Sequence, residues 1–517
     1  MYRVLRLAPR LLGASIALSS CCSPAVAETA GSFLCLTDGV IVKATRIETR
    51  DNKFFVYSEG AEKPTEYPAG AVQGVNLSNC ASAPAPTSVF GVHGSNTIGE
   101  RLMPMLVDAF ARRRAGSAAI VTLTGPEEQR IVLPPTLGRS VAIDLQAHGS
   151  GTAAKDMASG QAVIGMASRR LNADETKLLS DQFHVNPLAA ANEHVLALDG
   201  LAIIVNPKNP VQSLSLNQIA RVFSGEINNW KEIGGADRPI KVLRRDEKSG
   251  TFDTFKNLVL APAHLSILPG IAAFESSETL SERITNDPDA IGFVGLPYVN
   301  KNAVVSIASS CALVSRPTKF SIKTEEYPLT RRLYLYTLGE PSEKVASDLL
   351  RFALSDDAQP TIEEAEFVEQ SVALQDAEEQ KRWAEAALTA AANRRSVAAA
   401  DFMRTIAAAR RSSAVLRFES NSAQLDNKAM QDVDRLARFL FGKKFYVIGF
   451  ADSTGGSRNN ERLARERAEA VAEALRRVGL HVPADSVKSY SSFAPVACNE
   501  ETDGATKNRR VEVWVAR

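Results

Sequence analysis

Residues 89 to about 370 alternate apolar runs with helix-like patterns, and this alternation limits the possible folds more than any other feature. Runs of this length, bounded by turn residues, are typical of buried strands. Two pairs, Ser215 with Gln218 and Thr97 with Glu100, predict capping boxes at helix starts. Strands that alternate with helices predict α/β units. The clearest runs are VLALDGLAIIVN at 195–206, PIKVLR at 239–244 and AIGFVGL at 290–296.

The chain divides into several domains, because 517 residues are too many for one hydrophobic core. Residues 28–82 hold short β-branched and aromatic runs, which predict a small β domain. Residues 371–411 lack Gly and Pro and are rich in Ala, Glu and Arg, so they predict a helical linker packed on a neighbouring domain. A coiled-coil seam is the alternative, although no strict heptad is sustained. Residues 88–370 and 412–517 are predicted to be α/β, so the fold class is multidomain α/β.

Residues 1–27 have the features of a signal peptide. Three arginines precede an apolar stretch that is too short to span a bilayer, and Ala25-Val26-Ala27 has the small-x-small form of a cleavage site. The alternative is a lipobox that ends at Cys21, which would make Cys21 a lipidated N-terminus. Both alternatives predict export.

Four cysteines follow the signal peptide, and an exported chain meets oxidising conditions. Cys35 and Cys80 bracket the small β domain and are predicted to form a disulfide that compensates for its small core. Cys311 and Cys498 lie in different domains, and the sequence allows either a bridge or two buried thiols. No cysteine has metal-ligand spacing and the six histidines are scattered, so no metal or cofactor is expected.

Three turns that contain Gly with Ser or Thr each lie between an apolar run and a helix-like repeat. They are GSNT at 94–97, SGT at 150–152 and SGT at 249–251, and Arg245 lies four residues before the third. The first turn of a helix has free N–H groups and partial positive charge, glycine allows close approach, and a hydroxyl adds a donor. Each turn alone is compatible with a simple N-cap. If the turns converge with the arginine, they predict a site for a dehydrated oxyanion.

Three motifs follow one another in this region: Asn-Pro at 209–210, Phe-Ser-Gly-x-Ile-x-x-Trp at 223–230, and Arg-x-x-x-Ser-Gly-Thr at 245–251. In this order they resemble the phosphate-binding proteins of bacterial ABC transporters, over roughly residues 89–370. The resemblance implies a two-lobed α/β domain of the periplasmic-binding-protein type with the anion between the lobes. It implies a main anchor of Arg245, Ser249, Gly250 and Thr251, a first loop of Asn96, Thr97 and Ile98, and a second loop at Ser150.

One position departs from the family pattern. Many members carry an aspartate after the Ile-Gly strand that accepts a hydrogen bond from protonated phosphate, whereas this chain has Ser168 followed by Arg169. Some relatives share the Ser-Arg form, and Ser168 is included among the expected anion-binding residues. A cleft of donors, with Arg169 added, would discriminate less well between phosphate and sulfate. His93 and His148 lie beside two of the turns and are expected to pack around the site.

The C-terminal region carries a second pattern: Asp452 after an apolar strand, then Asn460, Leu463 and Arg467 at eight, eleven and fifteen residues beyond it, and NRRVE at 508–512. This pattern resembles the peptidoglycan-binding domain of the OmpA-like family, over residues 412–517. The resemblance implies that Asp452 binds the ammonium of diaminopimelate and Arg467 a carboxylate, with Asn460 beside them. The usual Thr and Ser of the family are replaced by alanines at 451 and 464. An intramolecular Asp–Arg surface pair is the plainer alternative.

These features predict an exported solute-binding protein that captures phosphate or a similar oxyanion and is anchored non-covalently to peptidoglycan. The expected location is the periplasm, at the peptidoglycan or outer membrane of a Gram-negative-type envelope. An ABC permease or another envelope protein is a candidate partner. The alternative is an envelope scaffold whose anion cleft is idle. A net charge of +1 argues against a nucleic-acid partner, and catalytic motifs are lacking, so no enzyme activity is expected.

Overall fold

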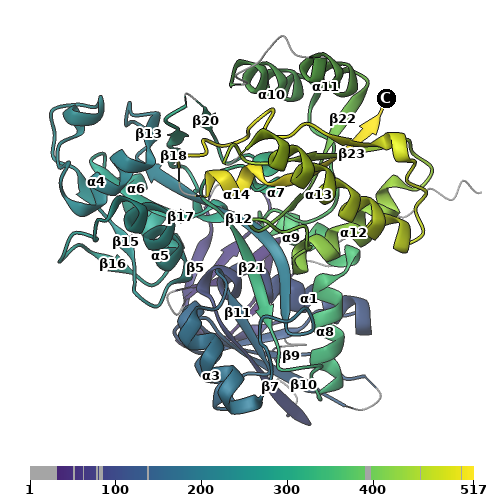
Figure 1. Cartoon of the computed structure of the whole chain (residues 1–517). Coiled ribbons are helices and arrows are strands. Elements are labelled where there is room, and N and C mark those ends of the chain that lie inside the picture. Colours follow the sequence, from purple (N-terminus) through teal and green to yellow (C-terminus); the bar gives the residue numbers. More distant parts are fainter. Residues whose placement is uncertain are drawn as a thin grey trace, which may run out of the picture.

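The computed structural model describes residues 32–517 apart from 51–52, 62, 77–79, 81–84, 137–138, 312, 391–396, 455 and 502 (Figure 1). The expected signal peptide, with Cys21, lies outside the described residues. Among the helices of the described part, none has the combination of length and apolarity that crossing a bilayer requires.

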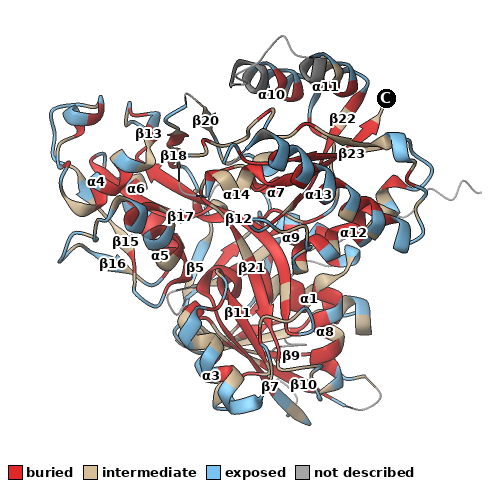
Figure 2. Ribbon diagram, viewed as in Figure 1, coloured by how far each residue is buried: buried red, intermediate tan, exposed pale blue. Residues whose placement is uncertain are grey.

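A mixed sheet runs through the centre of the molecule, and most of its strands are buried (Figure 2). The strand order is β14-β17-β12-β21-β11-β7-β10-β9-β8-β6-β1-β2, and β18 pairs with β12. The strands are β1 Ser32–Leu36, β2 Ile41–Ala44, β6 Val72–Val75, β7 Ser88–Gly94, β8 Ile120–Gly125, β9 Glu128–Val132, β10 Val141–Gln146, β11 Ile164–Ala167, β12 Glu193–Val205, β14 Lys241–Val242, β17 Ala290–Gly295, β18 Ala303–Val304 and β21 Thr330–Tyr336.

Strand β12 joins two halves of the α/β region. Its residues Glu193–Gly200 pair with β21, and its residues Leu201–Val205 pair with β17. We call residues 88–200 and 330–369 the first lobe, and residues 201–329 the second lobe. In Figure 1 the first lobe lies at the bottom, around α1, α3 and α8, and the second lies at the left, around α4, α5 and α6. This confirms the predicted periplasmic-binding-protein fold.

Helices flank the strands in both lobes. In the first lobe they are η3 Ile98–Leu102, α1 Met103–Ala115, α2 Ser150–Ala158, α3 Ala173–Phe183, α8 Lys344–Leu354, η8 Asp356–Ala358 and α9 Gln359–Glu364. In the second they are α4 Leu216–Ser224, η4 Trp230–Ile233, α5 Gly250–Phe255, η5 Lys256–Leu260, η6 Ala261–Ala263, α6 Ser277–Asn286, η7 Leu296–Tyr298 and α7 Lys319–Lys323. The capping box at α4 is confirmed, because Gln218 N donates to Ser215 Oγ at 3.1 Å and Ser215 N to Gln218 Oε1 at 2.9 Å.

Two small ladders complete the second lobe. The first contains β13 Ser213–Ser215, β19 Ser306–Ala308 and β20 Val314–Ser315, and the second contains β15 Arg244–Arg245 and β16 Ala273–Phe274. The core of this lobe is built around stacked aromatic rings. Phe255 and Phe293 lie with ring centroids 4.1 Å apart, and Phe223 tilts against both. Buried aromatic pairs of this kind stabilise the core of the second lobe.

The N-terminal strands do not form an isolated unit. A separate sheet contains β3 Arg46–Arg50, β4 Lys53–Tyr57 and β5 Thr65–Pro68, followed by η1 Ala69–Ala71. β1, β2 and β6, however, extend the large sheet, because Val75 on β6 pairs with Val121 on β8. The predicted disulfide between Cys35 and Cys80 is present.

The C-terminal region forms a four-stranded sheet of its own, in the order β22-β25-β23-β24. Alternate residues of each strand face opposite sides: Val447 packs with α12 and α13, whereas Ile448 packs with α11. Helices α10 and α11, which form from the Ala-rich region, pack on this face of the sheet. The elements are α10 Ala377–Ala390, α11 Val397–Ala407, β22 Ala409–Arg417, α12 Asn427–Leu440, β23 Phe445–Phe450, α13 Ser457–Arg477, η9 Ala484–Ser486, β24 Val487–Ser489, α14 Gly504–Asn508 and β25 Arg510–Ala516.

Candidate functional site

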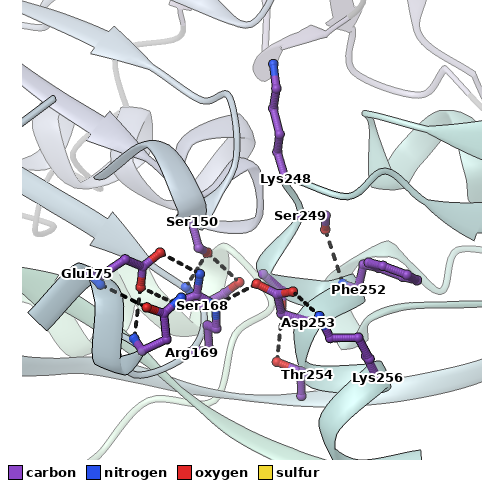
Figure 3. A network of polar contacts seen from close by, with 12 residues as sticks. Ser150, Ser168, Arg169, Glu175, Lys248, Ser249, Phe252, Asp253, Thr254 and Lys256 are labelled. Carbon is purple, nitrogen blue, oxygen red and sulfur yellow. Dashed lines mark hydrogen bonds and ion pairs between the residues drawn. The ribbon is translucent and has the colours of Figure 1, made fainter. Parts of the chain in front are cut away.

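The three turns predicted from the sequence meet where the two lobes face each other. Thr97 Oγ1 lies 3.1 Å from Thr251 Oγ1 of the other lobe. Ser150 Oγ lies 3.2 Å from Ser168 Oγ and accepts a hydrogen bond of 2.9 Å from Ser168 N. All four residues are buried. Figure 3 shows Ser150 and Ser168 on one side and the turn at Ser249 on the other. The N-terminal ends of α2 and α5, where helix dipoles carry partial positive charge, thus lie close together at this point.

Gly250 allows this close approach. A Cβ added at Gly250 would lie 2.9 Å from Ser150 Cβ and closer still to the hydroxyl oxygens of Ser150 and Ser168. Any side chain there would push the second lobe away from the first. The glycine of the third turn is therefore a requirement of the lobe contact.

Arg331 lies at the centre of this cluster, and the sequence reasoning missed it. Arg331 Nη1 donates to Thr251 Oγ1 at 2.7 Å and approaches Ser168 Oγ at 3.4 Å, and Nη2 approaches Thr97 Oγ1 at 3.4 Å. The guanidinium is buried and paired with the buried carboxylate of Asp199 at 2.6 Å. The available signal was a charged residue within each of two predicted strands, but the 132-residue separation of Arg331 and Asp199 hides the pairing.

Arg245, the predicted main anchor, is fully buried in the second lobe. Its Nε donates to the Phe274 carbonyl at 3.1 Å, and its other nitrogens donate to Ser277 Oγ and the Glu275 carbonyl. These partners belong to the second lobe. Arg245 therefore adds a buried positive charge that its own lobe holds in place.

The predicted capping box of Thr97 and Glu100 is wrong. Thr97 has helical dihedral angles and makes no cap, so its hydroxyl is directed to Thr251 instead. Glu100 is buried, and its carboxyl oxygens make no hydrogen bond of ordinary geometry within the described residues. Burial, followed by the charge of Glu127, raises the pKa of Glu100 well above its ordinary value, although Arg245 opposes this.

The remaining predicted residues have other contacts. Asn96 is buried, and its Nδ2 donates to the Ala147 carbonyl. Ile98 is buried at the start of η3. Ser249 is the N-cap of α5, with its Oγ accepting from Thr251 N at 3.2 Å. Arg169 is engaged elsewhere: it pairs with Glu175 at 2.7 Å and reaches across the lobes to Asp253 at 2.8 Å (Figure 3).

His148 forms another contact between the lobes. Its Nε2 lies 3.0 Å from Glu128 of the first lobe, and its Nδ1 lies 3.3 Å from Glu275 of the second. Burial lowers the pKa of His148, but the hydrogen bonds with the two carboxylates raise it by more. The pKa of His148 is therefore above its ordinary value.

Replacing His148 with glutamine is expected to lower Tm more at about pH 5.5 than at about pH 8.5. Because the folded pKa is raised above the unfolded value of about 6.5, the stabilisation is full below that value and is lost as pH rises through the folded pKa. Thermal unfolding of both proteins at the two pH values measures this. An equal Tm difference at both would contradict it.

The C-terminal residues predicted from the second motif also lie together. Asp452 accepts hydrogen bonds from Thr454 N at 2.8 Å and Arg509 Nη1 at 3.0 Å, and Asn460 Nδ2 donates to the Asp452 carbonyl at 3.1 Å. Burial raises the pKa of Asp452, but the bonds from Arg509 and Thr454 outweigh it and leave the pKa below its ordinary value. Asp452 is therefore ionised at neutral pH.

Arg467 has one unused donor group. Its Nε donates to the Ser422 carbonyl at 3.0 Å and its Nη2 to the Glu419 carbonyl at 3.2 Å. Its Nη1 is buried and has no hydrogen-bond partner in the described part of the chain. Burial, followed by the nearby charge of Arg509, lowers the pKa of Arg467 to about 10, so the guanidinium stays charged at neutral pH. Arg509 completes the charge pattern; it belongs to the NRRVE motif, which by itself does not indicate a role for this residue.

No group of three or more His, Cys, Asp or Glu side chains stands close enough to hold a metal ion among the described residues. Between the lobes, hydroxyls and the buried guanidinium of Arg331 can supply hydrogen bonds and positive charge, and the C-terminal domain presents one aspartate with two arginines.

Comparisons with known proteins show that the two-lobed region and the C-terminal domain resemble different families. A PBP superfamily domain matches residues 138–357, and an OmpA family domain matches residues 417–509. The phosphate-binding protein PstS of Bacillus subtilis is 31% identical over 220 residues, which cover 43% of this chain and 68% of that protein. PstS of Borreliella burgdorferi is 25% identical over 238 residues, covering 45% and 81%.

Among solved structures, an ABC-type phosphate transport receptor from Vibrio cholerae is 22% identical, with a TM-score of 0.41, over 54% of this chain and 99% of that one. The level of identity and the coverage of the Bacillus protein place the two-lobed region among its relatives. The chain therefore belongs to the PstS family of the PBP superfamily and carries, in the same polypeptide, a domain of the OmpA family.

Proposed function

We propose that this chain captures phosphate, or an oxyanion of similar shape and charge, between its two lobes while its C-terminal domain holds it to peptidoglycan. The proposal rests mainly on Arg331, whose buried guanidinium lies among hydroxyls from both lobes. A charged donor and helix N-termini at one point are what a dehydrated oxyanion needs. The relatives called PstS are named phosphate-binding proteins, which supports phosphate as the first candidate.

The chemistry of the cluster bears on which anion is preferred. Asp199 already neutralises Arg331, so the site adds less net charge than the arginine alone would. Hydroxyl groups can both donate and accept, so Thr97, Ser150, Ser168 and Thr251 are able to accept the proton of hydrogen phosphate without a carboxylate. We therefore propose that phosphate is preferred over sulfate, but by a modest margin.

Calorimetric titration of residues 28–517 with phosphate and then with sulfate tests this function. The expected result is saturable heat with phosphate and a weaker response with sulfate. No heat with phosphate, arsenate or sulfate would reject an anion-binding role.

We further propose that the C-terminal site binds the stem peptide of peptidoglycan at a zwitterionic amino acid such as diaminopimelate. Ionised Asp452 suits an ammonium group, and the unused Nη1 of Arg467 suits a carboxylate. Binding by this domain would keep the protein in the periplasm, next to the cell wall. Capture at the wall favours storage or sensing of the anion over shuttling to an ABC permease.

Replacing Asp452 with asparagine is expected to reduce the fraction of protein that sediments with purified peptidoglycan by about tenfold, because a charge-assisted bond of about 1.5–3 kcal/mol is lost. Asp485→Asn, at an exposed position of the same domain, is the matched control and is expected to sediment like the wild type. Equal sedimentation of D452N and the wild type would rule out the assigned role of Asp452.

One observation favours a second candidate, an envelope scaffold with an idle cleft. Thr97 and Thr251 bond each other, and Arg331 is paired with Asp199, so these groups have partners within the protein. In this case the chain would sediment with peptidoglycan yet give no heat with any oxyanion. The two measurements above therefore separate the candidates.

A further inference from the structure

The C-terminal domain is attached to both lobes of the anion-binding region. On the second lobe, Cys311 is bonded to Cys498, and Ser310 N donates to Glu501 Oε1 at 2.6 Å. On the first lobe, Asn427 Nδ2 donates to the Leu188 carbonyl at 3.1 Å and to Glu193 Oε1 at 2.9 Å. Figure 1 shows the domain above both lobes, with α14 beside the second and α12 toward the first.

Strand β21 contacts the anion site and the C-terminal domain through two adjacent residues. Arg331 points to Thr251 between the lobes, whereas Arg332, on the opposite face, pairs with Asp426 of the C-terminal domain at 2.7 Å. Arg332 also pairs with Glu325 at 2.6 Å, which fixes its position. A movement of β21 at the anion site would therefore displace Arg332 and change its contact with Asp426.

Asp426 is the N-cap of α12 and the last residue of a segment whose carbonyls bond Arg467. Asp426 Oδ1 accepts from Ala429 N at 2.7 Å as the helix cap. Within the same segment, the carbonyls of Glu419 and Ser422 hold Arg467, at 3.2 and 3.0 Å. Residues 419–426 thus run from the contact with Arg332 to the arginine of the peptidoglycan site.

The acidic side of that site is tied to the second lobe. Cys498, bonded to Cys311, is followed by Asn499, whose Oδ1 accepts from Ser453 N at 3.3 Å. Ser453 is the neighbour of Asp452. Both charged residues of the C-terminal site are therefore connected to the anion-binding region. Asp452 is connected through the disulfide, and Arg467 is connected through residues 419–426 and β21.

We propose that anion binding and peptidoglycan binding are thermodynamically coupled, so that this chain holds the wall more tightly when its anion site is occupied. This inference rests on the proposed function of both sites. An anion that bonds both lobes stabilises the arrangement in which they face each other. The C-terminal domain contacts both lobes in that same arrangement, with the 419–426 segment in place and Arg467 oriented. By linkage, the wall ligand tightens anion binding by the same factor.

Calorimetry on residues 28–517 measures the coupling. A diaminopimelate-containing stem peptide is titrated with and without saturating inorganic phosphate, and phosphate is titrated with and without the peptide. We expect each ligand to lower the Kd of the other by at least about fivefold. A change of less than about twofold, or a weakening, would overturn the coupling even if both ligands bind. Failure of phosphate alone to bind would instead reject the proposed function, and the coupling with it.

Asp426→Asn is the sharpest variant, because asparagine keeps the helix cap and removes the ion pair with Arg332. We expect it to bind each ligand alone as the wild type does, with the coupling reduced to less than about twofold. Arg332→Gln removes the other partner and is expected to give the same result. Asp356→Asn is the matched control, since it breaks an exposed ion pair with Arg438 in the same interface but away from residues 419–426. Full coupling in both D426N and R332Q would overturn the proposed route.

Discussion

Replacing Arg331 with methionine is expected to weaken phosphate binding by at least about thirtyfold, the equivalent of roughly 2 kcal/mol. The guanidinium is the buried positive charge that donates to hydroxyls of both lobes, and methionine keeps the bulk of the side chain without the donors. Calorimetry measures the loss. A variant with wild-type affinity would contradict the placement of the anion beside Arg331.

The same variant is expected to unfold more easily, because it leaves the carboxylate of Asp199 buried without its partner, at a cost of about 3–5 kcal/mol. The double variant Arg331→Met, Asp199→Leu removes both charges and is expected to regain most of this stability but none of the affinity. This control separates misfolding from lost binding. Arg245→Met is the second comparison, and a smaller loss of affinity is expected there because the donors of Arg245 already bond its own lobe.

Replacing Gly250 with alanine is expected to lower phosphate affinity by about tenfold or more while leaving the fold intact. The added Cβ would overlap Ser150 and Ser168 across the lobes, and overpacking of this kind costs about 1–3 kcal/mol. The lobes can relieve the clash by moving apart, so the radius of gyration in solution scattering is expected to rise, with little change in Tm.

Gly151→Ala is the matched control for this experiment. Gly151 occupies the equivalent place in the other Ser-Gly-Thr turn, but a Cβ there meets nothing closer than the Lys248 carbonyl at 3.9 Å. It is expected to behave as the wild type. Equal affinity of G250A and G151A for phosphate would show that the close approach of the lobes at Gly250 is not needed.

Local patterns in the sequence predicted local structure well. The capping box of Ser215 and Gln218 is present because all its atoms lie within one turn. The disulfide of Cys35 and Cys80 was predictable because the two cysteines bracket one small segment. The failure at Thr97 and Glu100 has the opposite cause: the pattern fits a cap, but a partner from the other lobe takes the hydroxyl of Thr97.

Features that depend on distant parts of the chain were not predictable. Arg331 and Asp199 come from different strands, and neither residue has a neighbour in sequence that indicates the pair. The disulfide between Cys311 and Cys498 is present, but the sequence could not predict it because it depends on how two domains pack. The attachment of the C-terminal domain to both lobes has the same origin, since Arg332 and Asp426 meet only in the folded chain.

A crystal structure of residues 28–517 grown with arsenate, whose anomalous scattering locates the anion, tests the central claim most directly. The account predicts a single tetrahedral anion between the lobes, accepting hydrogen bonds from Arg331 and from the N-terminal turn of α5 at Thr251. An anion bound away from Arg331, or anomalous density absent between the lobes at saturating arsenate, would contradict it.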